Sequence, residues 1–218
     1  VYSSGRFYAS LMDSIESTDL PTPTAIIGGV GTDVHMFGST RPLRAWHDTF
    51  ANWHAARARE ALAAFAELEP QPDEFQSDHK LSYYAYDLDE PALRQLEQAL
   101  YEARCEAKIV YSSQRDLDVL PRTADKGTAA RVIAQHLGFA PEDVVVCGDS
   151  GNDLAMFLQP DFRGVVVANA HPELKALRGS RVFQASEGYA GGVLEGLMHW
   201  RRERAAEPRA AGVSSEHI

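Results

Sequence analysis

Apolar and polar residues along the chain form two alternating patterns. Short runs of apolar and β-branched residues predict strands at 24–30, 81–86, 107–112, 143–147, 164–168 and 182–185. Apolar residues at helical spacing predict helices at 91–104, 126–137 and 189–202, and one long helix carrying the stripe from Leu43 to Leu68. This alternation of strands and helices is typical of an α/β fold built around a parallel sheet.

The strands and helices fall into two blocks separated by a long segment. Residues 1–34 and 119–203 carry the elements expected of a sheet core. Residues 35–118 between them are numerous enough to form an inserted α+β cap domain. We therefore predict a Rossmann-like parallel sheet core with an inserted cap, followed by a disordered tail at 204–218.

The composition describes an acidic chain of ordinary hydrophobicity. Its 218 residues include 31 acidic and 21 basic side chains, a formal net charge of −10, and 44% are hydrophobic. This charge argues against nucleic acid or a membrane surface as a partner, because no surplus of cations is available to neutralise phosphates. Two cysteines cannot build a disulfide framework, and no apolar stretch is long enough for a bilayer, so we expect a cytoplasmic protein.

The strongest chemical signal is the run CGDSGND at 147–153, which directly follows a predicted buried strand. Open α/β sheets bind their ligands at the carboxyl ends of such strands. Asp149 and Asp153 place two carboxylates there, in a turn that exposes backbone N–H groups, and this donor set suits Mg²⁺. A lone Gly-Asp pair could equally be a turn that caps the next helix, but the complete run favours a metal site.

Two further segments offer groups that could bind an anion. Lys126 opens the helix predicted at 126–137, where its charge opposes the helix dipole. A lysine there is explained if it faces a phosphoryl group, although an isolated lysine is more often a solvated surface charge. Ser4 and Gly5 follow a short strand and offer a hydroxyl and a backbone N–H to a phosphate, although such a serine can equally cap a helix.

In this order, the three segments resemble motifs II, III and IV of the haloacid dehalogenase superfamily of phosphatases. Most of the chain, from Val1 to about Trp200, resembles the sucrose-phosphate phosphatase family more closely. The matching stretches are YSSGR, VGTDVHMF, KLSYYAYDLD, IVYSSQRDLDVLPRTADKG, CGDSGNDLAMF, RGVVVANAHPEL and EGYAGGVLEGL. The resemblance implies a core of the haloacid dehalogenase type with an α+β cap of the C2 type that closes over the sugar.

The family pattern also implies catalytic and substrate-binding roles for matched residues. It implies that Ser4 and the Gly5 amide bind the phosphoryl oxygens, beside Arg6 in the same segment. It further implies that Lys126 offsets the negative charge of the nucleophile and the phosphate.

The same pattern implies a metal site and a sugar-binding loop. It implies that Asp149 ligates Mg²⁺ as cofactor, while Asn152 and Asp153 complete or orient the site. The loop expected to contribute to sugar specificity contains Gly31, Thr32 and Asp33. Asp33 stands where the family more often has Glu, which leaves the sugar selectivity open.

The superfamily pattern includes a residue that the matched stretches lack. Its members carry an apolar strand before motif II that ends in Asp-x-Asp, whose first Asp attacks phosphorus and whose second acts as general acid and base. The Asp-x-Asp pairs at 87–89 and 116–118 follow motif II, so we interpret them as carboxylates at the cap edge. The chain begins at Val1 without Met, and we expect a truncated fragment that lacks its nucleophile and is inactive alone.

Together these features predict a Mg²⁺-dependent sugar-phosphate phosphatase. The first substrate expected is sucrose 6-phosphate, hydrolysed through an aspartyl-phosphate intermediate, and another sugar or osmolyte phosphate is the alternative. A non-catalytic phosphatase-like domain, fused to or partnered with a sucrose-phosphate synthase, is a third hypothesis.

Overall fold

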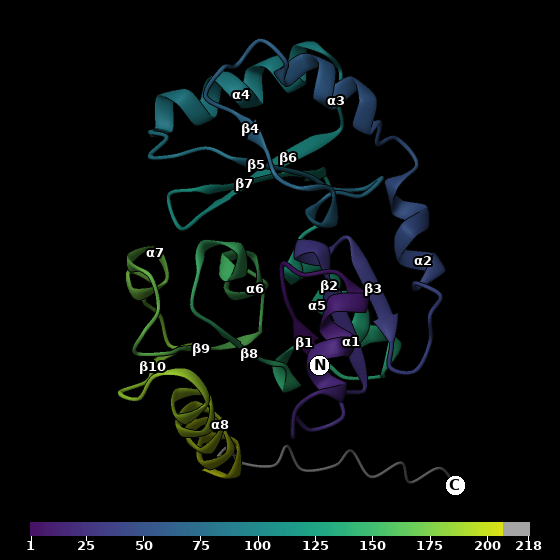
Figure 1. Ribbon diagram of the computed structural model, residues 1–218. Helices are drawn as coiled ribbons and strands as arrows, with labels where there is room; N and C mark the ends of the chain where they lie inside the picture. The colour runs from purple at the N-terminus through teal and green to yellow at the C-terminus, as the bar shows by residue number, and fades with distance from the viewer. Residues whose placement is uncertain (207–218) are drawn as a thin grey trace, which may run out of the picture.

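The structure, a computed structural model, describes residues 1–206 and consists of two stacked parts (Figure 1). The lower part, here called the core, contains β1 (Tyr2–Ser3), β2 (Ala25–Gly28), β3 (Asp33–Met36), β8 (Val145–Gly148), β9 (Arg163–Val166) and β10 (Val182–Gln184). The upper part, here called the cap, contains β4 (Glu69–Pro70), β5 (Leu81–Tyr84), β6 (Ala107–Ser112) and β7 (Asp116–Pro121). The elements of the core come from both ends of the described chain, so the cap is an insertion.

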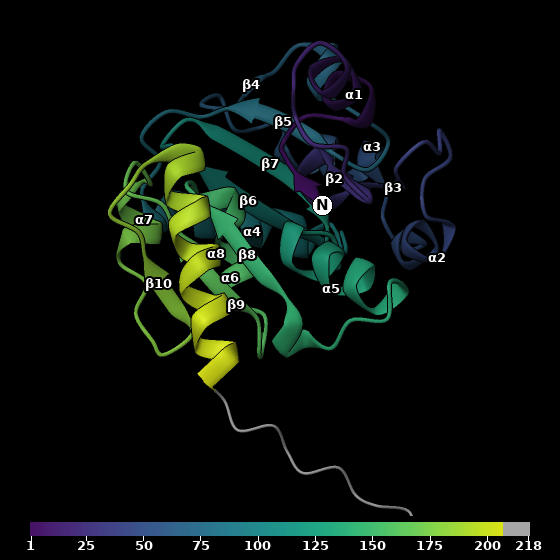
Figure 2. The same ribbon diagram turned by 90° about the horizontal axis from the view of Figure 1, so that it is seen from below.

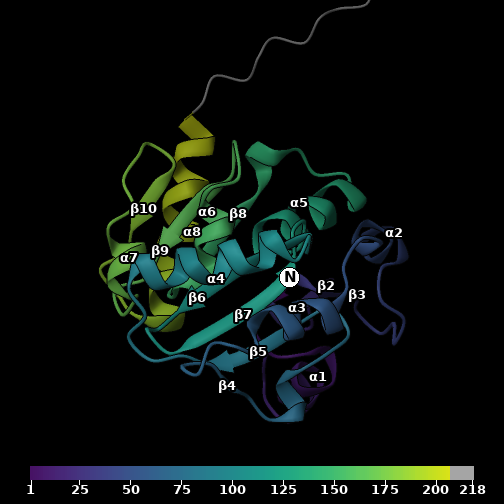
Figure 3. The same ribbon diagram turned by 90° about the horizontal axis from the view of Figure 1, so that it is seen from above.

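Helices cover the outer faces of both parts. The core carries α1 (Tyr8–Glu16), α5 (Lys126–His136), α6 (Leu154–Phe157), α7 (Pro172–Lys175) and α8 (Tyr189–Ala206). In the cap, α3 (Ala55–Leu62) and α4 (Glu90–Glu102) lie over the sheet (Figure 3). The short helix α2 (Arg44–His47) lies at the side of the molecule, on the segment that leads from the core to the cap (Figure 1). Seen from below, α8 crosses β8, β9 and β10 (Figure 2). None of the described helices is both long and apolar enough to cross a membrane.

The core strands confirm the predicted parallel pairing, in two sheets rather than one. β1 pairs in parallel with β2, and β9 lies in parallel between β8 and β10. β3 pairs antiparallel with β2, which the apolar pattern did not predict. The strand order within the described residues is β1-β2-β3 in one sheet and β10-β9-β8 in the other, so β1 and β8 are edge strands.

A cavity of about 640 Å³ lies between these two edge strands, and we call it the strand groove. Tyr2 and Ser3 of β1 line one side, and 145–147 of β8 line the other. Its remaining walls are mostly apolar and come from α5, α8 and neighbouring segments: Ala130, Ile133, Ala134, Leu137, Phe139, Val144, Met156, Val193 and Leu197. Two unpaired strand edges and an apolar lining are the surroundings of an interior strand of a parallel sheet.

The cap sheet has one apolar face and one polar face. Its strands are antiparallel in the order β4-β5-β7-β6, with Leu81 opposite Val119 and Ser82 opposite Asp118. Leu81 and Val119 are buried in one cluster with Leu96 of α4, whereas Ser82 and Asp118 point to the other face. The strand β7, which contains the Asp-x-Asp pair at 116–118, is one of the two interior strands of the cap sheet.

The single long helix predicted from Leu43 to Leu68 is wrong. The chain forms α2 at 44–47, a 3₁₀ turn (η2, Asp48–Phe50) and α3 only from Ala55. Trp46 Nε1 donates to the Gly31 carbonyl in the core at 2.8 Å, and Trp53 Nε1 donates to the Asp78 carbonyl in the cap at 2.6 Å. Because the two tryptophans are held by different parts of the molecule, the segment between them bends.

The paired strands cross both predicted limits of the cap. β3 spans residue 34 and belongs to the core sheet, and β7 spans residue 118 and belongs to the cap sheet. The last helix extends to Ala206, so residues 204–206 are helical and not part of a disordered tail. The rest of the predicted tail, 207–218, lies outside the described residues.

Candidate active site

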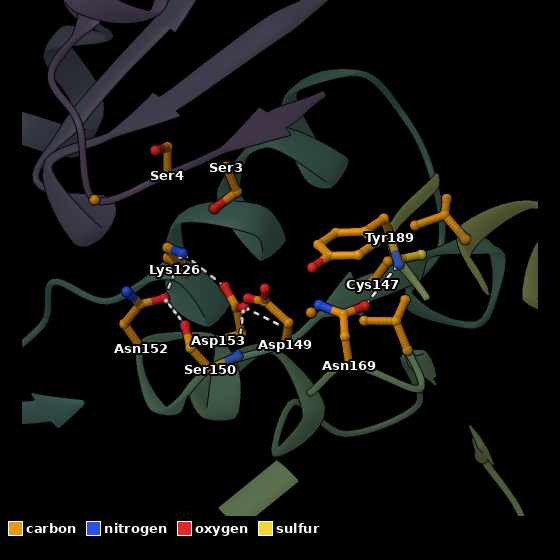
Figure 4. Close-up of a pocket in the computed structure, with 14 residues that line it drawn as sticks. Ser3, Ser4, Lys126, Cys147, Asp149, Ser150, Asn152, Asp153, Asn169 and Tyr189 are labelled. Atoms are coloured by element: carbon orange, nitrogen blue, oxygen red, sulfur yellow. Dashed lines mark hydrogen bonds and ion pairs between the residues drawn. The ribbon is translucent and has the colours of Figure 1, made fainter. Parts of the chain in front are cut away.

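A second cavity, of about 390 Å³, opens at the carboxyl ends of β1 and β8 (Figure 4). Its lining includes most of the residues predicted to bind phosphate or metal: Ser4, Gly5, Lys126, Asp149, Asn152 and Asp153. The remaining lining residues are Ser3, Cys147, Gly148, Ser150, Val167, Asn169, Tyr189 and Val193. The structure thus brings together three segments that are far apart in the sequence.

Lys126 lies at the first position of α5 and reaches into this cavity. Asp125 caps the helix by accepting a hydrogen bond from the Thr128 amide at 2.7 Å. The Lys126 ammonium donates to Asn152 Oδ1 at 2.6 Å and pairs with Asp153 Oδ1 at 2.6 Å, with 5% of the side chain exposed. Because an amide oxygen and a carboxylate both bind it, the Lys126 ammonium is held in one place.

The loop after β8 is organised by Asp153. Its Oδ2 accepts hydrogen bonds from the backbone amides of Asp149 at 3.0 Å and Ser150 at 3.3 Å, while Oδ1 binds Lys126. Asp153 therefore fixes the loop and the lysine at once, and it is buried. Asp149 is exposed, and its carboxylate is turned toward the cavity beside Asp153 (Figure 4).

A close contact brings this loop up to α5. A Cβ on Gly127 would lie 2.0 Å from the Ala155 carbonyl oxygen, so only glycine allows α5 and α6 to approach this closely. The approach sets the short distances between the Lys126 ammonium and the loop.

The segment after β1 supplies the opposite wall. The Ser4 amide donates to the Ile27 carbonyl at 2.8 Å, and the Val30 amide donates to the Ser4 carbonyl at 3.1 Å, so the backbone at Ser4 is fixed from both sides. Ser3 and Ser4 both border the cavity, above Lys126 in Figure 4. The Ser3 hydroxyl is buried and has no hydrogen-bond partner within the described residues.

The structure does not bring Arg6, Gly31, Thr32 or Asp33 into the cavity lining. The Arg6 guanidinium donates to the Ser14 hydroxyl at 2.9 Å, on the outer side of the core. The Thr32 hydroxyl donates to the Gly29 carbonyl at 2.9 Å within its own loop. These contacts lie away from the cavity, and the predicted roles of the four residues in binding the substrate stay predictions.

The Asp33 carboxylate is bound to groups within the core. One oxygen accepts from the Tyr8 amide at 2.8 Å and the other contacts His35 Nε2 at 2.6 Å. Burial alone would raise the pKa of Asp33, but the hydrogen bonds from His35 and the Tyr8 amide hold this pKa below its usual value. Burial alone would lower the pKa of His35, but its bond to Asp33 raises that pKa above its usual value.

Eight lining residues were not predicted as site residues, and five of them carry a polar or thiol side chain: Ser3, Cys147, Ser150, Asn169 and Tyr189. Asn169 follows β9 as a polar residue after a buried strand, the same signal that marked the loop after β8. Its Oδ1 accepts from the Tyr189 amide at 2.6 Å and so fixes the start of α8. Burial raises the pKa of Cys147 to about 11, which keeps the thiol protonated and agrees with an inert cysteine.

Within residues 1–206, no three or more His, Cys, Asp and Glu side chains are grouped so as to hold a metal ion. Mg²⁺ commonly binds through one or two carboxylates together with water and substrate phosphate oxygens. The exposed Asp149 carboxylate at the cavity is compatible with that pattern.

The architecture is that of the haloacid dehalogenase fold with a cap, as the sequence predicted. A haloacid dehalogenase-like hydrolase of Bacillus subtilis superposes with a TM-score of 0.59 at 18% identity, covering 91% of this chain and 76% of that one. At that identity the match supports the fold alone.

Within this fold, the sequence identifies a narrower family: a family model for sucrose-6F-phosphate phosphohydrolase matches residues 1–201. The chain belongs to this family of phosphatases. The sucrose-phosphatase of Synechocystis sp. PCC6803, solved with sucrose and phosphate, superposes with a TM-score of 0.84 at 30% identity, covering 92% of this chain and 84% of that one.

The names of the relatives that this chain matches refer to two different sugar phosphates. The mannosylfructose-phosphate phosphatase of Agrobacterium fabrum is 38% identical over 203 residues, which are 92% of this chain and 82% of that protein. The probable sucrose-phosphatase 2 of Arabidopsis thaliana is 32% identical over 220 residues, or 96% of this chain. The chain spans only about half of that plant relative, 52% of its length.

Proposed function

We propose that the full-length protein hydrolyses the phosphate ester of a disaccharide phosphate, with sucrose 6-phosphate as the first candidate, and that this chain supplies most of its active site. The observation that carries the proposal is the placement of Lys126, Asn152 and Asp149 around one cavity, opposite Ser4. The relatives named above act on sucrose phosphate or mannosylfructose phosphate according to their names, and both are phosphorylated disaccharides. A mannosylfructose phosphate is therefore the second candidate substrate.

The residues of the cavity supply charge and hydrogen bonds to a phosphoryl group. The Lys126 ammonium is held by Asn152 and Asp153 in a buried position, where its charge is only weakly screened. It stabilises the negative oxygens of the phosphoryl group as their charge is redistributed in the transition state. Ser4 and the Gly5 amide border the same cavity and donate hydrogen bonds to those oxygens.

We propose Mg²⁺ as the cofactor, held by Asp149 together with phosphate oxygens of the substrate and water. Such an ion polarises the phosphoryl oxygens and offsets their negative charge. Asp153 orients this arrangement, because its own oxygens bind Lys126 and two backbone amides.

We also propose that the attacking aspartate lies outside residues 1–218, on a strand that fits the strand groove. The Asp-x-Asp pairs of the cap are occupied elsewhere: Asp118 pairs with Lys80, Asp116 with Arg115, and Asp89 caps α4. The strand groove runs between β1 and β8 toward the cavity, and Ser3 and Cys147 line both. A strand in this groove would end beside Lys126 and Asp149.

The experiment is a phosphate-release assay with the full-length protein and with residues 1–218 alone. Sucrose 6-phosphate, a mannosylfructose phosphate and glucose 6-phosphate are compared with and without Mg²⁺. We expect Mg²⁺-dependent release from a disaccharide phosphate by the full-length protein, and none by residues 1–218. Equal rates with glucose 6-phosphate would exclude the disaccharide preference, and turnover by residues 1–218 would exclude an external nucleophile. A cytoplasmic location and a sucrose-phosphate synthase partner stay predictions.

A further inference from the structure

The residue just before Lys126 is held by the cap. Lys108 on β6 of the cap donates to Asp125 Oδ2 at 2.5 Å, while Asp125 Oδ1 caps α5 through the Thr128 amide. The exposed fractions of the two side chains are 28% for Lys108 and 11% for Asp125. One carboxylate therefore fixes the start of α5 and binds the cap at the same time.

The backbone of Asp125 is held by a second, independent contact. A Cβ on Gly31 would lie 2.3 Å from the Asp125 carbonyl carbon, so Gly31 packs directly on this peptide. The Gly31 carbonyl in turn accepts the hydrogen bond from Trp46 Nε1, on the segment that leads into the cap. Two separate links from the cap side thus converge on Asp125.

The position of Asp125 determines that of Lys126, because the two residues share a peptide bond. The Lys126 ammonium lies 2.6 Å from both Asn152 Oδ1 and Asp153 Oδ1, so a small displacement of α5 breaks these contacts. Displacements of about 1 Å in a catalytic arrangement can lower rates by about 100-fold.

We propose that Lys108 and Asp125 are positioning residues that couple the placement of the cap to Lys126. This rests on the proposed phosphatase function, because Lys126 is the residue through which they act. When the cap lies as in this structure, Lys108 holds Asp125, and the lysine ammonium faces the phosphoryl group. When the cap moves away, this link is released and Lys126 binds phosphate less well.

The test compares Lys108→Met, Asp125→Asn and the double variant in the full-length protein. Asparagine caps a helix about as well as aspartate, so Asp125→Asn removes the charge of the pair and keeps the cap of α5. The readouts are kcat/KM for sucrose 6-phosphate and the Kd for inorganic phosphate measured by calorimetry. Lys175→Met, which removes an exposed lysine of α7, is the matched control, and Lys108→Arg is the conservative variant.

We expect each single variant to lower kcat/KM and to weaken phosphate binding by about 10-fold, an effect well below that of a 1 Å misplacement. The double variant is expected to match the single variants, because both break the same contact. Lys108→Arg is expected to retain most of the affinity, and Lys175→Met all of it.

Three results would overturn the proposal. The first is a phosphate affinity of Lys108→Met within twofold of the control, and the second is additive effects in the double variant. The third is a lower melting temperature with unchanged kcat/KM and Kd, which would make the pair purely structural. A wild-type protein that hydrolyses no sugar phosphate would refute the proposed function, while the phosphate affinities would still test the coupling.

Discussion

The core and the cap each contain a buried lysine–aspartate pair, and the two pairs have different surroundings. In the core, Lys126 and Asp153 lie 2.6 Å apart with 5% and 8% of their side chains exposed. In the cap, Lys80 and Asp118 lie 3.0 Å apart with 4% and 9% exposed. Burial and distance alone do not distinguish them.

The cap pair is surrounded by other protein groups. Lys80 also donates to the Phe75 carbonyl at 3.1 Å and to the Ser82 hydroxyl at 2.5 Å, and its ammonium lies 5.4 Å from the Phe7 ring centroid. The core pair instead borders the cavity at the sheet edge. The core pair therefore faces space for a ligand, whereas protein groups satisfy the cap pair.

Substitution of the core lysine, Lys126, is expected to affect enzymatic activity most strongly. If Lys126 acts as proposed, Lys126→Met is expected to lower kcat for a sugar phosphate by about 1,000-fold or more, because it removes the charge proposed to stabilise the phosphoryl oxygens. Steady-state phosphate release by the full-length protein measures this, with Lys175→Met as control. Activity within tenfold of wild type would show that Lys126 does not contact the phosphoryl group.

Substitution of the cap lysine, Lys80, is expected to lower the stability of the protein and not its activity. Lys80→Met leaves the Asp118 carboxylate buried without its cation, and removing one partner of a buried pair costs about 3–5 kcal/mol. Urea unfolding measures the loss, and the activity of the folded fraction is expected to stay within a few-fold of wild type. A large loss of activity at unchanged stability would assign Lys80 a role toward the substrate.

A third pair, between the buried His35 and the partly buried Asp33, extends the comparison because the pKa values of both its members are shifted. The pKa of His35 is raised above 6.5, so its contribution to stability is complete below that pH and is lost as pH rises through the raised pKa. The pKa of Asp33 is lowered below 3.8, so its contribution is present above that pH and is lost as pH falls through the lowered pKa.

The pair is therefore expected to stabilise the core most between about pH 4 and pH 6.5. Raising the pH to 9 is expected to lower the free energy of unfolding, because His35 loses its proton and with it the ion pair to Asp33. Urea unfolding at pH 5.5 and pH 9 measures this, and His35→Gln is expected to remove the difference. An equal difference in His35→Gln, or its loss in the exposed His136→Gln, would assign the titration to another group.

The sequence predicted the parts of the site that are contiguous in the chain. The run at 147–153 forms a loop at the end of a parallel strand because a buried apolar strand directly precedes it. Lys126 could be placed because it opens a helix in the right order relative to that strand. Asn169 and Tyr189 were missed, because only the packing of α8 against the sheet brings them to the same edge.

The cap was predicted less well, because its strands carry polar residues on one face. The strand β7, Asp-Leu-Asp-Val-Leu-Pro, was not among the predicted strands, and its two aspartates were interpreted as carboxylates at the cap edge. Only the contacts of Asp118 with Lys80 and Ser82 explain why a charge is buried there. The bend near Trp53 depends likewise on partners distant in sequence.

The chain passes between core and cap only twice within the described residues, at 37–54 and at 122–125. Two crossings of this kind form a hinge. They favour rotation of the cap about the line that joins them over sliding or tilting across that line. Trp46 lies on the first crossing and Asp125 on the second. One crossing touches Gly31 and the other directly precedes Lys126, so any rotation of the cap about these crossings acts next to the cavity of the candidate active site.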